Sequence, residues 1–446
     1  MSKKAALHNL GCKVNAYELE AMQQLLEEGG YEIVPFEPGA DVYVINTCTV
    51  TNIADRKSRQ MLHKAKKMNP DAIVVAAGCY VQAAGEELKK DEAIDIVIGN
   101  NKKQDLLQIL EEYQEKQATD FSNIIDINHT KEYESLHISR TAEHTRAYLK
   151  IQDGCNQFCT YCIIPFARGR VRSRSMEDVM GEVNRLAQGG YQEVVLTGIH
   201  LSSYGADFAE WEKSEEYPYG TALLKLIEAI QNTDGITRIR LGSLEPGIVT
   251  EAFAKELSGF DKVCPHFHLS MQSGCDATLK RMNRRYDTAQ YEERCRILRK
   301  YFDNPALTTD IIAGFPGETE EEFAATKEYV ERINFFETHI FKYSRRKGTK
   351  AAVMENQVPE QKKAERSQIL IEIGQRHQRA YADSFAGKEV EVLFEEKIME
   401  NGREYWVGHT REYVKAKLQS GTDLTNVQRT CKVAEVSEDG TLYLFS

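Results

Sequence analysis

The chain has 446 residues, 41% of them hydrophobic, and a formal net charge of −11 at pH 7, which excludes a uniformly basic nucleic-acid-binding protein. No apolar run reaches the ~18 residues of a membrane-spanning helix, and the amino-terminal segment MSKKAALHNLGCK lacks the long apolar core of a signal peptide. These features predict a soluble cytoplasmic protein of roughly two to four domains that would contact RNA only through local basic patches.

Residues 1–112 are expected to form an open parallel α/β sheet domain, because apolar strands alternate there with amphipathic helices. Three of the ten cysteines stand where a predicted strand ends and a helix follows, in ALHNLGCKVN, VYVINTCTVTN and IVVAAGCYVQ. The carboxyl ends of parallel strands meet at one edge of such a sheet, where ligands bind. A single free cysteine is often a core residue. The repeated order of strand, cysteine and helix instead predicts a cluster site made by Cys12, Cys48 and Cys79.

The helix after Cys12 is expected to begin with a capping box of Asn15 and Glu18 and to stop at Gly29. Residues 113–143 are polar and charged with little periodicity, which predicts an irregular linker. This linker is expected to cross the surface to a second α/β unit.

Residues 144–376 are expected to form that second unit, in which the alternation of strands and helices resumes. The candidate strands are YLKIQ, EVVLTGI, RIRLGSL, HFHLSM, ALTTDIIAGF and ETHIFKY. Six strand–helix units fall short of the eight of a closed barrel, so the sequence predicts an open, partial (β/α)6 barrel. The chemistry of β/α barrels lies on the loops that follow the strands.

The string KIQDGCNQFCTYCIIP follows the first of these strands and holds three cysteines at a Cys-x3-Cys-x2-Cys spacing. Iron–sulfur clusters are held by thiolates, and four would close a cubane cluster, so three leave one iron open to a small molecule. The same offsets also trace one face of a helix. Gly154, Pro165 and the aromatic residues between the thiols favour a loop. We therefore predict a cluster held by Cys155, Cys159 and Cys162.

Other strand ends of this unit carry glycine or polar residues, in LTGIHLSSYG, HLSMQSGCD and TTDIIAGFPGETEEEF. Glycine lets a backbone approach a ligand closely, and a polar neighbour can bind a ribose or a carboxylate. Tight turns explain many such glycines, so the candidates are supported only by their position at strand ends. They are Gly198, Gln272, Asp310 and Gly314.

Two basic stretches, RGRVRSR and KYSRRKGTK, are the local patches that could contact RNA. Alternate residues of an extended chain point to one side, and arginine binds phosphate bidentately. A solvated charged edge is the alternative. The candidate RNA-binding residues are Arg168, Arg170, Arg172, Arg174, Arg345 and Arg346.

Residues 377–446 are expected to form a third, small domain. A long amphipathic helix over 361–387 precedes short segments with period-two patterning, which predict a small antiparallel β-barrel. Such barrels often bind single-stranded RNA through strands and loops. Trp406 is expected in the core, and the other aromatic and basic candidates are Arg403, Tyr405, His409, Arg411, Tyr413 and Lys415.

The order of these motifs resembles the methylthiotransferase family of radical S-adenosylmethionine (SAM) enzymes over the whole chain, with a C-terminal barrel similar to a TRAM domain. The segments LGCKVNAYELE, NTCTVTNIADRKSRQ, KIQDGCNQFCTYCIIPFARGRVRSR and GFPGET carry the resemblance. They are most similar to the branch that acts on N6-threonylcarbamoyladenosine at position 37 of tRNA. The isopentenyladenosine branch typically has glutamine–methionine after the first cysteine and arginine before GCN, where this chain has Lys13, Val14 and Asp153. The branch that acts on a ribosomal protein typically has proline after the first cysteine.

This resemblance implies two 4Fe–4S clusters and SAM as cofactors, with the tRNA anticodon stem-loop as substrate. Cys155, Cys159 and Cys162 would hold the cluster that binds SAM, and the four strand-end candidates would contact SAM. An electron from a flavodoxin- or ferredoxin-like donor would split SAM into a 5′-deoxyadenosyl radical, which removes hydrogen from carbon 2 of the adenine. Cys12, Cys48 and Cys79 would hold an auxiliary cluster that delivers sulfur, and a second SAM would supply the methyl group.

Two other classes stay open on the sequence alone. One is a related enzyme that acts on isopentenyladenosine or on a ribosomal protein. The other is a non-enzymatic iron–sulfur protein that binds RNA or senses its environment, which would bind RNA without consuming SAM. Nothing in the sequence demands more than a monomer.

Overall fold

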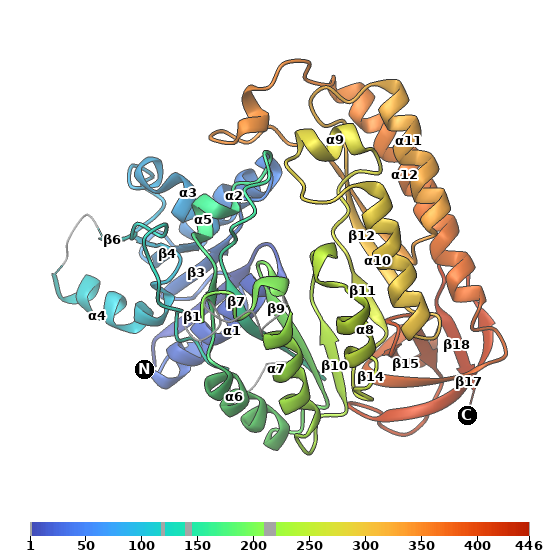
Figure 1. Ribbon diagram of the computed structural model, residues 1–446. Coiled ribbons are helices and arrows are strands. Elements are labelled where there is room, and N and C mark those ends of the chain that lie inside the picture. Colours follow the sequence, from blue (N-terminus) through green and yellow to red (C-terminus); the bar gives the residue numbers. More distant parts are fainter. Residues whose placement is uncertain (1, 117–120, 139–144, 209–219, 446) are drawn as a thin grey trace.

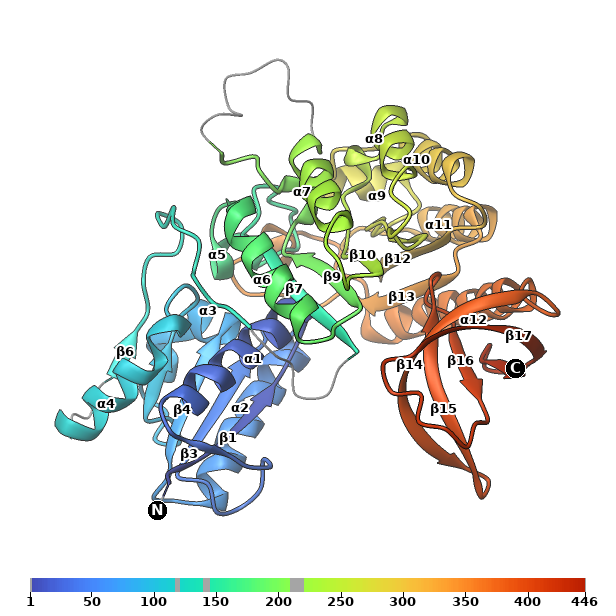
Figure 2. The same cartoon turned by 90° about the horizontal axis from the view of Figure 1, so that it is seen from below.

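The computed structural model describes residues 2–116, 121–138, 145–208 and 220–445. An N-terminal α/β unit, a central open barrel and a small C-terminal barrel follow one another along the chain (Figure 1). The N-terminal unit and the small barrel lie on different sides of the central unit (Figures 1 and 2). The predicted α/β fold class with a small terminal β-barrel is confirmed.

The N-terminal unit is a parallel sheet of six strands in the order β2-β1-β3-β4-β5-β6. Its strands are β1 (Lys4–Asn9), β2 (Glu32–Ile33), β3 (Val42–Thr47), β4 (Ile73–Gly78), β5 (Ile96–Ile98) and β6 (Phe121–Asn123). Its helices are α1 (Lys13–Glu28), α2 (Asn52–Met68), α3 (Cys79–Leu88) and α4 (Leu106–Lys116), with a 3₁₀ turn η1 (Lys103–Asp105) before α4.

Helices cover both faces of this sheet, which is why β3 is buried along its whole length. Alternate residues of β3 point to opposite faces. Val42 and Val44 pack with α1 and α4, whereas Tyr43 and Ile45 pack with α2 and α3. The two cores hold the carboxyl ends of β1, β3 and β4 side by side.

The predicted linker 113–143 is more ordered than expected. Within it, α4 continues to Lys116, and Phe121–Asn123 adds the edge strand β6 to the sheet. Leu136 and Ile138 are buried in the core of the central unit. The segment therefore packs against both α/β units, while the predicted boundary at 143 lies outside the described residues.

The central unit contains the six parallel strands that the sequence predicts, as two sheets joined by isolated bridges from Ile239 to Val263 and from Leu244 to Leu269. The parallel strands are β7 (Arg146–Asp153), β9 (Glu193–Gly198), β10 (Arg238–Leu241), β11 (His266–His268), β12 (Ala306–Ala313) and β13 (Glu337–Lys342). A short strand β8 (Arg172–Ser173) pairs antiparallel with β7. The partial (β/α)6 barrel is confirmed.

Helices cover the outer face of this barrel (Figure 1). They are α6 (Met176–Gln188), α7 (Thr221–Gln231), α8 (Glu251–Leu257), α10 (Thr288–Tyr301) and α11 (Glu320–Ile333). Two short helices, α5 (Ile164–Arg168) and α9 (Asp276–Arg281), follow the carboxyl ends of β7 and β11, and α5 packs against α3. The 3₁₀ turns are η2 (Leu201–Ser203), η3 (Pro246–Ile248) and η4 (Lys350–Val353).

A single helix, α12 (Glu360–Asp383), connects the central unit with the small barrel and runs without a break across the predicted boundary at 376. The small barrel is closed in the order β14-β15-β16-β18-β17. Its strands are β14 (Glu389–Glu400), β15 (Arg403–Thr410), β16 (Lys415–Leu418), β17 (Gln428–Val436) and β18 (Leu442–Phe445). The pairs are antiparallel except β16 with β18, and Trp406 lies in the core as predicted.

The small barrel docks at the amino ends of the central strands. Arg146, the first residue of β7, forms an ion pair with Glu395 of β14. Arg238, the first residue of β10, donates from Nη2 to the Glu391 carboxylate at 3.0 Å. The loop that contains Cys155 follows the carboxyl end of β7, so the small barrel and this loop lie at opposite ends of the strand.

Three groups that the sequence offers for RNA contact take part in this docking. The rings of His409 and Tyr413 stack at 4.4 Å, and the Tyr413 hydroxyl accepts a hydrogen bond from Arg146. Arg411 donates from Nη2 to the Val263 carbonyl at 2.9 Å. These side chains therefore stabilise the interface between the barrels. In the described part of the chain, no helix is long and apolar enough to cross a membrane.

Candidate functional site

Cys12, Cys48 and Cys79 converge at the carboxyl edge of the N-terminal sheet, because β1, β3 and β4 are neighbours and each cysteine follows one of them. Asn15 Oδ1 lies 4.0 Å from both Cys12 Sγ and Cys79 Sγ. A Cβ on Gly11 would lie 3.0 Å from Cys48 Sγ, so the third thiol lies beside the residue that precedes Cys12. All three thiols are free.

Gly78 makes the turn that presents Cys79. Its φ of 98° lies in the left-handed region, and a Cβ there would lie 2.4 Å from Asn46 Oδ1. Only glycine fits this close approach without displacing a neighbour. The strand can therefore turn directly into α3 with Cys79 as the first helical residue.

Cys155, Cys159 and Cys162 lie on a loop between β7 and α5. The helix-face alternative is wrong, because α5 begins only at Ile164. Gly154 has a φ of 71°, and a Cβ there would lie 1.8 Å from the Arg170 carbonyl oxygen. The Cys155 amide donates to Gly169 O and the Cys162 amide to Cys159 O, both at 3.0 Å. These backbone bonds close the loop on itself and gather the three thiols.

Burial keeps several of these thiols protonated in the absence of a metal. It raises the pKa of Cys48 and of Cys155 to about 11, and that of Cys162 to about 12. Thiolates are the ligands of iron, so cluster binding has to displace these protons. Two sets of three free thiols, of which Cys48, Cys79 and Cys155 are buried, fit two clusters that each keep one iron open.

Arg168 joins the two cysteine regions from a fully buried position. Its Nε donates to Cys79 Sγ at 3.1 Å, and its Nη2 donates to Asn15 Oδ1 at 2.7 Å. Its Nη1 lies 2.7 Å from Glu18 Oε1 and 3.1 Å from Asp153 Oδ2. Because Asp153 stands two residues before Cys155, one guanidinium group links the N-terminal sheet to the loop of the second cysteine set.

This network corrects the prediction of a capping box at the start of α1. Cys12 is the N-cap, without a side-chain capping bond, and Asn15 and Glu18 are buried. Burial alone would raise the pKa of Glu18, but Arg168, Lys103 and Lys150 hold it well below its usual range. The carboxylate therefore binds tertiary partners in place of the helix end.

The structure also contradicts most of the predicted RNA surface. Arg168, Arg172 and Arg174 are at most 1% exposed, because Arg168 ends α5 and the chain then turns into the paired strand β8. Arg174 forms an ion pair with Glu182 at 2.5 Å, and Arg172 donates from Nη1 to the Arg168 carbonyl oxygen at 3.0 Å. Buried charges paired in this way are not available to phosphate.

Arg346 is also buried, with Nη1 2.6 Å from Asp55 Oδ2. Arg170 and Arg345 are exposed. The guanidinium of Arg170 lies 4.4 Å from the centre of the Phe158 ring. These two arginines are the predicted RNA contacts whose exposure still permits that role.

Two of the four predicted SAM contacts lie on central strands, and the other two lie just after such strands. Gly198 ends β9, Gln272 follows β11 with a φ of 71°, and Gly314 follows β12. The close approach that requires glycine at Gly314 is to Lys363 of α12, since a Cβ would lie 2.4 Å from Lys363 Cγ. The SAM-binding role of all four stays a prediction.

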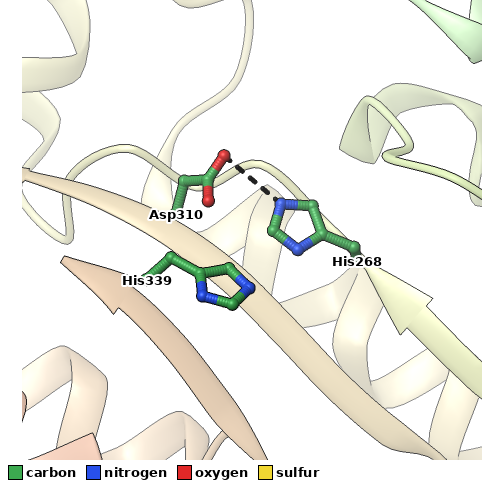
Figure 3. A group of neighbouring side chains, drawn as sticks. All are labelled: His268, Asp310 and His339. Carbon is green, nitrogen blue, oxygen red and sulfur yellow. Dashed lines mark ion pairs between the residues drawn. The ribbon is translucent and has the colours of Figure 1, made fainter. Parts of the chain in front are cut away.

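Asp310 lies in the middle of β12 and faces two histidines from the neighbouring strands (Figure 3). Its Oδ2 is 3.4 Å from His268 Nε2, and His339 is its partner in register on β13. Among the described residues, these three form the one group of His, Cys, Asp and Glu whose ligand atoms lie within 4.8 Å of one another. The His268 and His339 rings are stacked, with 5.7 Å between their centres.

Sequence reasoning missed Arg284 entirely. Its side chain is only 6% exposed, and its Nη1 donates to Cys159 Sγ at 3.3 Å while its Nη2 lies 2.9 Å from Glu245 Oε2. The sequence RMNRRYD shows only a group of basic residues. Local pattern carries no sign of a contact between residues so far apart in the chain.

Comparison with known proteins agrees with this architecture. Residues 4–99 match the uncharacterized protein family UPF0004, and residues 149–330 match the radical SAM superfamily. The solved structure of TsrM, a radical SAM methyltransferase of Kitasatospora setae with cobalamin and a 4Fe–4S cluster bound, superimposes with a TM-score of 0.58. It shares 16% identity, and the match covers 79% of this chain and 74% of that chain. The fold and these matches define a radical SAM enzyme.

Two relatives with high coverage of this chain identify its family. The threonylcarbamoyladenosine tRNA methylthiotransferase MtaB of Bacillus subtilis is 41% identical over 420 residues, covering 94% of this chain and 91% of the relative. The tRNA-2-methylthio-N(6)-dimethylallyladenosine synthase of Acetivibrio thermocellus is 35% identical over 417 residues, covering 92% and 84%. The chain belongs to the tRNA methylthiotransferase family of radical SAM enzymes.

Proposed function

We propose that this enzyme adds a methylthio group to carbon 2 of N6-threonylcarbamoyladenosine at position 37 of tRNA. The observation that carries the proposal is the 41% identity to MtaB of Bacillus subtilis over 94% of the chain. Lys13, Val14 and Asp153, which stand where the isopentenyladenosine branch typically differs, support the same substrate. Asp153 belongs to the buried network around Arg168, so this difference lies close to the cysteine sets.

In this proposal each cysteine set holds a 4Fe–4S cluster. Cys155, Cys159 and Cys162 hold the one that binds SAM, and Cys12, Cys48 and Cys79 hold the auxiliary one. The clusters with SAM supply radical cleavage, sulfur and the methyl group. The chain orients the thiols through the turns at Gly78 and Gly154, and it shields Cys48, Cys79 and Cys155 from water by burying them. Gly198, Gln272, Asp310 and Gly314 contact SAM.

The tRNA anticodon stem-loop would meet the enzyme beside the junction of its α/β units. A groove of about 760 Å³ lies there, with Arg59, Tyr80, Phe166 and Lys347 among its lining residues. Phe166 is 48% exposed, so its ring is available to stack on a base. Exposed arginines supply phosphate contacts, namely Arg170 and Arg345.

The remaining features of the proposal concern partners and organisation. A flavodoxin- or ferredoxin-like protein supplies electrons, the enzyme acts as a monomer, and its tRNA substrate places it in the cytoplasm. The functional units are an N-terminal domain (1–112), a linker (113–143), a radical SAM domain (144–376) and a TRAM-like RNA-binding domain (377–446).

The second candidate substrate is isopentenyladenosine in tRNA, because a relative of that specificity is 35% identical over 92% of the chain. The lower identity and the three residues named above disfavour it. A ribosomal protein as substrate has no comparable support among the relatives described above.

Nucleoside mass spectrometry tests the proposal directly. Anaerobically reconstituted enzyme, SAM and a reductant are incubated with tRNA that carries threonylcarbamoyladenosine, and in parallel with tRNA that carries isopentenyladenosine. We expect the methylthio form of the first nucleoside alone. Cleavage of SAM to 5′-deoxyadenosine without that product would overturn the substrate and leave the radical SAM class standing. RNA binding without SAM consumption would support the non-enzymatic class.

A further inference from the structure

Each cysteine set has one buried arginine that donates a hydrogen bond to a ligand sulfur. Arg168 Nε is 3.1 Å from Cys79 Sγ, and Arg284 Nη1 is 3.3 Å from Cys159 Sγ. Arg168 ends α5 and Arg284 lies on the loop between α9 and α10, and each donates to a sulfur of only one set. The same arrangement therefore occurs twice, built from unrelated segments.

Both guanidinium groups are fixed by further bonds. Arg168 is held by Glu18, Asn15 and Asp153 at distances between 2.7 and 3.1 Å. Arg284 donates from Nη2 to Glu245 Oε2 and to the Ser270 carbonyl, both at 2.9 Å. The partners leave one N–H of each arginine directed at sulfur. A group held in this way keeps its position when the cluster changes charge, since the fork geometry of arginine is rigid.

We propose that Arg168 and Arg284 are positioning residues that raise the reduction potential of the auxiliary and the SAM-binding cluster, respectively. This inference rests on the cluster assignment in the proposed function. Each cluster takes up one electron from the external donor and becomes one unit more negative. A fixed cation with a hydrogen bond to sulfur favours this reduced form, because hydrogen bonds to the sulfurs and net charge set the potential.

The potentials can be separated by removing one cluster at a time from the full-length enzyme. In a background with Cys155, Cys159 and Cys162 replaced by Ala, the auxiliary cluster alone is titrated anaerobically and followed by electron paramagnetic resonance. We expect Arg168→Gln to shift the midpoint potential to more negative values, with about a tenfold change in the oxidised-to-reduced ratio at fixed potential. For a one-electron couple this is about 59 mV.

The matched control is Arg174→Gln, because Arg174 is equally buried and paired but its hydrogen bonds go to Asp178, Tyr17 and His137, not to a cysteine. The reciprocal test uses Cys12, Cys48 and Cys79 replaced by Ala. There Arg284→Gln should lower the potential of the SAM-binding cluster, and Arg168→Gln should leave it near the parent value. A potential unchanged by Arg168→Gln or Arg284→Gln, at full iron content, overturns the inference for that arginine.

Where Arg168→Gln yields too little folded protein, Arg168→Lys is the second variant. Lysine keeps the cation but loses the fixed Nε–H, so a smaller negative shift is expected, and a potential equal to the parent's overturns the inference. Iron analysis of the parent backgrounds distinguishes a failure of the cluster assignment from a failure of the inference about the arginines. If a background with intact Arg168 and Arg284 binds no cluster, the cluster assignment fails and the inference fails with it.

Discussion

Asp55 and Arg346 form an ion pair between the N-terminal and central units, with 2.6 Å between Asp55 Oδ2 and Arg346 Nη1. Arg346 Nη2 also donates to Thr49 Oγ1 at 2.6 Å, next to Cys48. Both charged side chains are largely buried. The pair therefore holds the segment after β13 against the edge of the sheet that presents the cysteines.

Arg346→Ala is expected to weaken this junction by about 1–3 kcal/mol, because it leaves the partly buried Asp55 carboxylate without its charged partner. Thermal unfolding and limited proteolysis between the units measure the effect. The double variant Arg346→Ala with Asp55→Ala should recover part of the loss. If the double variant is no more stable than Arg346→Ala, the two side chains are not coupled.

The two cysteine sets are expected to separate two activities. Cys155→Ala should abolish formation of 5′-deoxyadenosine from SAM, since the SAM-binding cluster loses a ligand. Cys48→Ala should keep SAM cleavage and lose the methylthio product. Both are measured by mass spectrometry of the same reaction mixture. Loss of SAM cleavage in Cys48→Ala, with the iron of the other cluster retained, would contradict this division.

Asp310→Asn is expected to raise the dissociation constant for SAM by about 10–100-fold, the effect of losing a charge-assisted hydrogen bond. Equilibrium binding to the reconstituted enzyme measures this value. Asp303→Asn is the control, because Asp303 is exposed on the loop before β12. Equal SAM affinity in the Asp310 variant and the wild type would remove Asp310 from the binding site.

The two exposed candidate arginines, Arg170 and Arg345, are expected to contact tRNA phosphates. Arg170→Ala and Arg345→Ala should each weaken tRNA binding and reduce the slope of log affinity against log salt by about one. Filter binding over a range of salt concentrations measures both quantities. Arg296→Ala is the control, since Arg296 is exposed on α10 and pairs with Glu293. Unchanged salt slopes in both variants would place the RNA elsewhere.

Glu20 is expected to make stability depend on pH. Burial raises its pKa from 4.5 to about 7, and Oε2 has no hydrogen-bond partner among the described residues. The folded state therefore holds the proton more tightly than the unfolded state. This contribution is present below pH 4.5 and is lost as pH rises toward 7, by at most about 3 kcal/mol.

Glu20→Gln removes this loss, so its melting temperature should exceed that of the wild type at pH 8 and approach it near pH 5. Melting curves of both proteins at several pH values measure the difference. An increase that is the same at both pH values would point to packing and not to titration.

The sequence predicts the six central strands and both cysteine sets because their signals are local. A strand that ends in cysteine and leads into a helix is visible in a dozen residues, and neighbouring strands of a parallel sheet bring such ends together. The three-residue strand β6 gave no comparable signal, since FSN has neither length nor apolar alternation.

The buried arginines could not be predicted in the same way. Alternate arginines at 168, 170, 172 and 174 are typical of an exposed edge, and only the tertiary partners Glu18 and Glu182 reverse this for Arg168 and Arg174. Asn15 and Glu18 match the local pattern of a helix cap, but in the structure both side chains bind the buried guanidinium of Arg168. Contacts between distant segments leave no periodic trace in the chain.

The unbroken helix α12 sets the distance between its start in the central unit and the small barrel at its end. Its 24 residues span about 36 Å at 1.5 Å per residue, and the ion pairs of Arg146 and Arg238 anchor the small barrel beside its far end. These contacts hold the barrel away from the cysteine loops, which lie at the other end of the central strands. An RNA that contacts both the small barrel and the cysteine loops would have to span a fixed distance. The nucleoside that reaches the cysteine loops would then be selected by its distance from the part of the RNA bound to the barrel.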